Sequence, residues 1–291
     1  MSKNQQATPY RDLDPTTRAA LRLSRSDLSV RLRERARIYQ CNEDMIADMA
    51  ETILADYQAL LADGRDQVAM IVPVGPVGQY PILARLCVER EVSLDRLTLF
   101  IMDEYLTDDG AWIPETDPLS FRAHMWRNLL DLLPDDMRPA LVVPDPTDPG
   151  SVGRMIEDLG GVDLCYAGVG ITGHLAFNEP LAGEIDPAYF AALPTRIVPL
   201  LPETRLINSV TAARGNVARI PRMAVTVGMK EILGARKLRI FMNRHWQSAA
   251  IRRLLAGPVT AAFPASLAQG HTDWTLHVVD HVLDAPEPEL A

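Results

Sequence analysis

Two side chains suited to acid–base chemistry follow apolar runs in this chain. Asp103 comes directly after Leu97–Met102, and His174 comes after Val162–Ala167 and a glycine-rich turn. Burial at the end of a strand raises the proton affinity of a carboxylate, which can then take a proton from carbon next to a carbonyl. Glu179, five residues after His174, can accept from one ring nitrogen and leave the other free. Asp103 and His174 together therefore favour proton transfer on a small sugar.

Each of these residues also has a purely structural interpretation. Asp103 can cap the turn that follows its strand. Asn178 and Glu179 can cap a helix, and His174 can be a hydrogen-bonded structural histidine. The residues alone leave both interpretations open.

The turn before the histidine holds three glycines, Gly168, Gly170 and Gly173. Glycine tolerates positive φ and lets the backbone approach a ligand closely. Their spacing is that of a dinucleotide-binding fingerprint, but Asn178–Pro180 interrupts the helix that such a site requires. A dinucleotide site is therefore disfavoured.

Strands must position these residues, and the apolar pattern of the chain predicts such strands. Apolar runs predict strands at Val68–Val72, Leu97–Met102, Leu141–Val143, Val162–Ala167, Leu238–Met242 and Trp274–Val279. Helical spacing predicts helices at Asn42–Leu61, Pro81–Glu91, Ser120–Leu133, Pro202–Asn208 and Gln247–Leu255, and Met223–Gly228 is interpreted as a turn into a helix. This alternation indicates an α/β fold with a mostly parallel sheet, which binds ligands at the carboxyl ends of its strands.

Composition narrows the class of partner to small molecules. The chain has 291 residues, of which 47% are hydrophobic, and a net charge of −9. An acidic chain without a basic patch argues against nucleic acid. No apolar run is long enough to predict a membrane span, and the N-terminus lacks the apolar segment of a signal peptide.

Cysteine usage points to a reducing compartment. Cys41, Cys87 and Cys165 have no C-x-x-C spacing, and this pattern predicts a cytoplasmic protein. The sequence contains no cluster with the spacing of metal ligands, so no metal is expected. Residues 1–35 are polar and are interpreted as an N-terminal extension, and residues 36–291 as a single α/β domain.

Six segments of the chain resemble the glucosamine-6-phosphate deaminase/isomerase family. They are FIMDEYL (Phe100–Leu106), DPLSFRAHMWRNLL (Asp117–Leu130), GVGITGHLAFNEP (Gly168–Pro180), TRI (Thr195–Ile197), PETRLINS (Pro202–Ser209) and AVTVGMKEIL (Ala224–Leu233). The resemblance runs from about Ala36 to near the C-terminus. The related 6-phosphogluconolactonases share the strand–turn–histidine layout but usually carry DER where this chain has DEY, which favours the deaminase branch.

The resemblance implies a Rossmann-like, three-layer α/β/α fold and an aldose–ketose rearrangement that releases ammonia without a metal or organic cofactor. It implies that Asp103 moves a proton between C2 and C1, that His174 opens the pyranose ring and that Glu179 orients His174. It also assigns Arg205 to phosphate binding. Members of the family are often homo-oligomers, and a homo-oligomer is expected here.

The chain departs from the family pattern at both ends of the implied site. Relatives carry Asp two residues before the histidine, where this chain has Thr172, so the catalytic set becomes Asp103, His174, Glu179 and Thr172. The implied substrate-binding set is Val74, Gly75, Pro76, Gly170, Gly173, Arg205 and Gln247. In that set the hydroxyls of the family's phosphate loop are missing, Pro76 lacks an amide donor and Gln247 stands near the family's lysine. An insertion around Asp186–Leu193 alters the segment that closes over the substrate in relatives.

These departures predict an amino sugar with an altered or absent phosphate as the substrate of a deaminating ketol isomerase. The sequence is also compatible with two other functions. One is hydrolysis of a sugar lactone, which ammonia release would distinguish. The other is a non-catalytic sugar-binding protein, which Thr172 keeps open.

Overall fold

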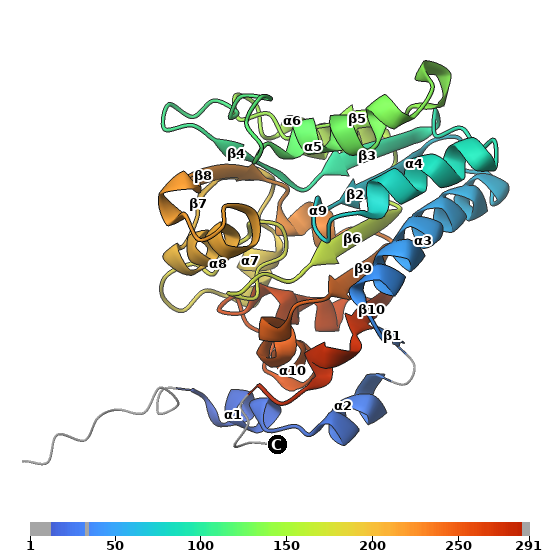
Figure 1. Ribbon diagram of the computed structural model, residues 1–291. Helices are drawn as coiled ribbons and strands as arrows, with labels where there is room; N and C mark the ends of the chain where they lie inside the picture. Colours follow the sequence, from blue (N-terminus) through green and yellow to red (C-terminus); the bar gives the residue numbers. More distant parts are fainter. Residues whose placement is uncertain (1–12, 33–34, 287–291) are drawn as a thin grey trace, which may run out of the picture.

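The computed structural model describes residues 13–32 and 35–286, and in that part of the chain a parallel sheet forms the centre (Figure 1). Its seven strands have the order β1-β10-β9-β6-β2-β3-β5, and every neighbouring pair is parallel. The strands are β1 (Ala36–Tyr39), β2 (Val68–Val72), β3 (Leu97–Ile101), β5 (Ala140–Val142), β6 (Leu164–Gly168), β9 (Lys237–Met242) and β10 (Trp274–Val279). The predicted α/β fold with a mostly parallel sheet is confirmed.

Helices cover both faces of this sheet and make three layers. One face carries α3 (Asn42–Ala62), α4 (Gln79–Glu89) and α5 (Phe121–Asn128), of which α3 and α4 lie side by side in Figure 1. The other face carries α6 (Ser151–Asp158), α9 (Met229–Leu233) and α10 (Ser248–Ala256). All of β2 is buried, and its side chains alternate between the two layers, as expected of a strand covered on both faces.

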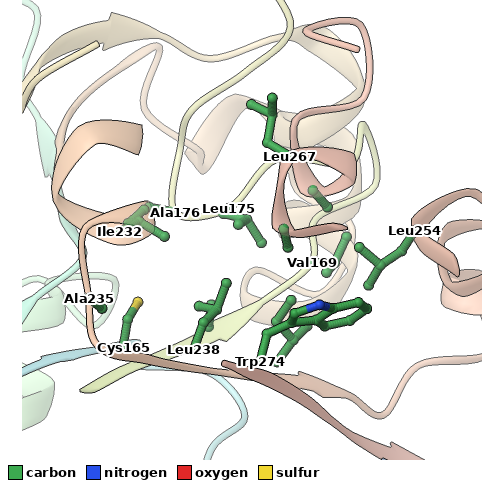
Figure 2. Packing of buried hydrophobic residues seen from close by; sticks show 14 of the residues in the cluster. Cys165, Val169, Leu175, Ala176, Ile232, Ala235, Leu238, Leu254, Leu267 and Trp274 are labelled. Carbon is green, nitrogen blue, oxygen red and sulfur yellow. The ribbon is translucent and has the colours of Figure 1, made fainter. Parts of the chain in front are cut away.

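The core on the α9 and α10 face is shown from close by in Figure 2. Cys165 and Leu238 project from the sheet toward Ile232 of α9, and Trp274 packs near Leu254 of α10. Leu175 and Ala176, which directly follow His174, belong to the same cluster. The turn is therefore anchored in the core.

A second, antiparallel sheet lies beside the carboxyl edge of the first. It consists of β4 (Asp103–Leu106), β8 (Met223–Thr226) and β7 (Arg196–Pro199) in that order, and it is flanked by α7 (Pro187–Ala191) and α8 (Pro202–Ala212) (Figure 1). The interpretation of Met223–Gly228 as a turn is wrong, because β8 occupies it and only then does α9 begin. The insertion at Asp186–Leu193 forms α7, with Asp186 as its N-cap.

The chain before the first strand contains two helices, α1 (Pro15–Leu21) and α2 (Arg25–Leu32). Leu28 and Leu32 of α2 are buried in the core, and the buried guanidinium of Arg252 in α10 donates to the carbonyl oxygen of Leu23 at 2.9 Å. Residues 1–12 of the predicted extension lie outside the described residues. Short 3₁₀ helices occur at Leu130–Leu132, Asp135–Met137, Val217–Arg219, His245–Gln247, Pro264–Gly270 and Asp280–Leu283.

None of the helices within residues 13–32 and 35–286 is long and apolar enough to span a membrane.

Candidate active site

A cavity of about 450 Å³ opens at the carboxyl ends of the central strands. Its lining comes from the segments that follow β2, β3, β6 and β9, and α8 contributes from the small sheet's side. Parallel strands all end at the same edge, which is why segments far apart in the sequence meet there. Asp103 and His174 both line this cavity.

Asp103 lies where the chain leaves β3 and enters β4. Its backbone pairs with Thr226 of β8, which fixes the position of its side chain. Burial, and secondly the charge of Glu104, raise the pKa of Asp103 to about 8. A carboxylate with such a pKa is a stronger base than an ordinary aspartate and is suited to taking a proton from carbon.

The capping role that the sequence left open for Asp103 belongs to its neighbour. Glu104 is fully buried and accepts from the backbone N–H groups of Phe121 and Arg122 at 3.1 and 2.9 Å. It also accepts from the hydroxyl of Ser120, the N-cap of α5, at 2.9 Å. Because successive strand residues point to opposite faces, Glu104 holds α5 while Asp103 faces the cavity.

His174 is a largely buried residue of the cavity lining, and one of its ring nitrogens is hydrogen-bonded. Its Nδ1 lies 3.0 Å from Oε2 of Glu179, and since a carboxylate only accepts, Nδ1–H is the donor. The hydroxyl of Thr172 donates to the same Oε2 at 2.6 Å and lies 2.9 Å from Nδ1. Burial alone would raise the pKa of Glu179, but hydrogen bonds from His174 and Thr172 and the His174 charge outweigh it and lower the pKa. Nε2 is left free.

Thr204 adds a second hydroxyl to this cluster. It is fully buried in α8, and its Oγ1 lies 3.5 Å from Nδ1 of His174. Thr204 lies within the resembling segment Pro202–Ser209 but was not predicted as a site residue, because its approach depends on how α8 packs against the turn. No helix begins at Asn178 or Glu179 in the described chain, so the helix-cap interpretation of these two residues is wrong.

Two of the predicted glycines serve the turn in different ways. A Cβ on Gly170 would lie 1.9 Å from Nε2 of His174, so the glycine makes room for the imidazole. Gly173 has φ +84° and a Cβ there would lie 2.2 Å from the ring of Phe263. Gly170 lines the cavity, whereas Gly173 packs against the core and does not.

The predicted phosphate end of the site carries few side-chain donors. Val74, Gly75 and Pro76 line the cavity. Gln247 lines it too, but its amide donates to Val169 O at 2.8 Å and accepts from the N–H groups of residues 243 and 244. Arg205 is absent from the described lining, and its guanidinium donates to Ile220 O at 3.3 and 3.4 Å.

Several cavity residues were not predicted from the sequence as parts of the site. Tyr105, Phe121 and Phe177 form an aromatic wall, with ring centroids of Tyr105 4.8 Å from Phe121 and 5.5 Å from Phe177. Asn208 and Arg244 also line the cavity. The spacing D-E-Y could have pointed to Tyr105, because alternate residues of a strand face the same side.

Within the described residues, no group of three or more histidine, cysteine or acidic side chains could hold a metal ion.

No protein-family model matches the chain. The glucosamine-6-phosphate deaminase of Porphyromonas gingivalis is 32% identical over 207 residues, which cover 69% of this chain and 74% of that protein. The glucosamine-6-phosphate deaminase of Halothermothrix orenii is 32% identical over 209 residues, covering 69% and 80%. That of Phocaeicola vulgatus is 28% identical over 245 residues, covering 77% and 88%.

Solved structures show the same fold. A monomeric glucosamine-6-phosphate deaminase superposes with a TM-score of 0.69 at 24% identity, covering 85% of this chain and 98% of that one. A 6-phosphogluconolactonase from Thermotoga maritima superposes with a TM-score of 0.57 at 15% identity, covering 84% and 100%.

Proposed function

The chain belongs to the glucosamine-6-phosphate deaminase family, and we propose that it converts an amino sugar into a ketose and ammonia. The observation that carries this proposal is the pairing, in one cavity, of Asp103 with a raised pKa and His174 with a free Nε2. One group suits removal of a proton from carbon, and the other suits transfer between sugar oxygens.

His174 acts first. Glu179 and Thr172 hold the Nδ1 side of the ring, so Nε2 moves the proton of the C1 hydroxyl to the ring oxygen and opens the sugar. This step conserves protons and yields the open-chain aldehyde. Thr172 thus supports the histidine through Glu179. It is not one of the described residues that line the cavity.

Asp103 then transfers a proton along the open chain. Its carboxylate takes the C2 proton, which leaves negative charge on O1 and the amine on C2. One proton of the amine then passes to O1, and Asp103 returns the C2 proton to C1, so the amino aldehyde becomes its hydroxy-imine isomer. The resulting imine at C2 takes up water and releases ammonia, leaving the ketose. Asp103 ends the cycle in its starting protonation state, so these steps need no cofactor.

We infer further that the substrate lacks the phosphate at C6. Phosphate sites rely on hydroxyls, backbone N–H groups and cations. Here Val74 and Pro76 offer no hydroxyl, Gln247 is committed to backbone groups, and Arg205 donates to Ile220 O. Arg244 is the one lysine or arginine among the described cavity-lining residues, and it is exposed.

The test is a comparison of kcat/KM for ammonia release from 2-amino-2-deoxyhexoses with and without a 6-phosphate. The proposal predicts a higher value for the unphosphorylated sugars. It also predicts that Arg244→Ala changes the ratio of the two by less than about tenfold, because one exposed cation contributes little. A strong preference for the phosphorylated sugar would refute the proposal that the substrate lacks the 6-phosphate.

A further inference from the structure

Tyr105 shares the cavity-facing side of β4 with Asp103. The two residues are separated by one position on the strand, and side chains at such positions point to the same face. Both line the cavity, whereas Glu104 between them is turned to α5. Any substrate that presents its C2 carbon to Asp103 therefore lies against the same face of β4 as Tyr105.

The hydroxyl of Tyr105 has one hydrogen bond and keeps its own proton. Nδ2 of Asn208 donates to it at 2.9 Å, so the phenol oxygen accepts. No acceptor for the phenol proton occurs among the described residues. Burial, and secondly the charge of Asp103, raise the pKa of Tyr105, so the hydroxyl stays protonated throughout the physiological range. It is a donor without an acceptor.

The ring itself is held firmly. Tyr105 is 2% exposed, and its ring packs on Phe121 and Phe177. Phe177 belongs to the turn of His174, and the two rings meet edge to face at 5.9 Å. The direction of the hydroxyl is thus set by the same packing that positions the histidine.

We propose that Tyr105 is a further catalytic residue of this site. Its hydroxyl donates a hydrogen bond to O1 of the open-chain sugar, the oxygen that gains negative charge while Asp103 removes the C2 proton. No proton is transferred in this interaction. Asn208 is a positioning residue, because its amide accepts nothing from the phenol and leaves the phenol proton for the substrate. The inference rests on the proposed deaminase function.

The central variant is Tyr105→Phe, which keeps the ring and its packing and removes only the donor. A donor to a developing oxyanion contributes about 10²-fold to kcat, so kcat is expected to fall by that factor with KM nearly unchanged. Asn208→Leu, of similar size, is expected to lower kcat by roughly tenfold, because the phenol loses its tether. Since both variants act through one hydroxyl, the double variant is expected to match Tyr105→Phe.

Tyr166→Phe is the matched control, since Tyr166 is also buried and its hydroxyl donates to Asp56 outside this cavity. Its kcat is expected to equal that of the wild type, and Tm of every variant reports the integrity of the fold. If Tyr105→Phe raises KM alone, or lowers Tm without lowering kcat, the catalytic role is wrong. If the losses of kcat are additive in the double variant, Asn208 does not act through Tyr105. Wild-type protein that releases no ammonia from any amino sugar would instead refute the proposed function.

Discussion

The pKa of Asp103 gives the sharpest quantitative prediction. With a pKa of about 8, roughly one carboxyl in ten is ionised at pH 7 and roughly one in a hundred at pH 6. If the ionised form is the base, kcat/KM rises about tenfold per pH unit below pH 8 and levels off above it. An ordinary aspartate, with a pKa of 3.8, would leave the rate flat over this range.

A change at Glu104 distinguishes the titration of Asp103 from that of the substrate. The amine of an amino sugar also titrates, at about pH 8, so the wild-type profile alone is ambiguous. Glu104→Gln removes the negative charge that helps to raise the pKa of Asp103, and charges roughly 7 Å apart on a strand interact by about 2 kcal/mol. The profile should therefore move to lower pH by about one and a half units, while the titration of the amine stays fixed.

The assay is initial-rate ammonia release between pH 5 and 10, with Tm measured at each pH. Tm matters because Glu104 accepts four hydrogen bonds, from Tyr105, Ser120, Phe121 and Arg122, and a glutamine amide cannot accept all of them. A folded Glu104→Gln enzyme with an unmoved profile would show that Asp103 is not the titrating base. A wild-type rate independent of pH between 5 and 9 would refute the raised pKa.

Three further predictions concern the histidine turn. Thr172→Val removes the hydroxyl that holds Glu179 and is expected to lower kcat by about 10- to 100-fold, whereas Thr172→Ser keeps activity; equal rates in the two variants would contradict this. Gly170→Ala should abolish activity because its Cβ displaces the imidazole, and Gly173→Ala should lower the free energy of unfolding by roughly 2–4 kcal/mol through its clash with Phe263 and its positive φ. Denaturant unfolding checks Gly173→Ala, and an unchanged midpoint would count against that prediction.

The sequence was most informative where burial dictates residue type. The inner strands β2, β3 and β9 are largely buried and apolar, so they were predicted almost to the residue, whereas the half-exposed edge strand β1 was not predicted. Asp103 and His174 interrupt the pattern at strand ends, which is why their meeting at one edge could be predicted. The family resemblance is confirmed by the relatives that share about a third of the aligned residues.

Features that depend on long-range packing could not be predicted from the sequence. The small sheet was missed because β4, β7 and β8 have four residues each, too few for a period to be recognised. The assignment of Gly173 and Arg205 to the substrate site stays a prediction; Phe263 packs on Gly173, and Ile220 O accepts from Arg205. The division at residue 35, the oligomeric state and the cytoplasmic location stay predictions.

The most direct measurement is the product balance of purified protein with an unphosphorylated 2-amino-2-deoxyhexose, comparing the wild type with Asp103→Asn. Ketose and ammonia are expected in equal amounts from the wild type, and neither product is expected from the variant. Ammonia without ketose, or an Asp103→Asn protein as active as the wild type, would contradict it.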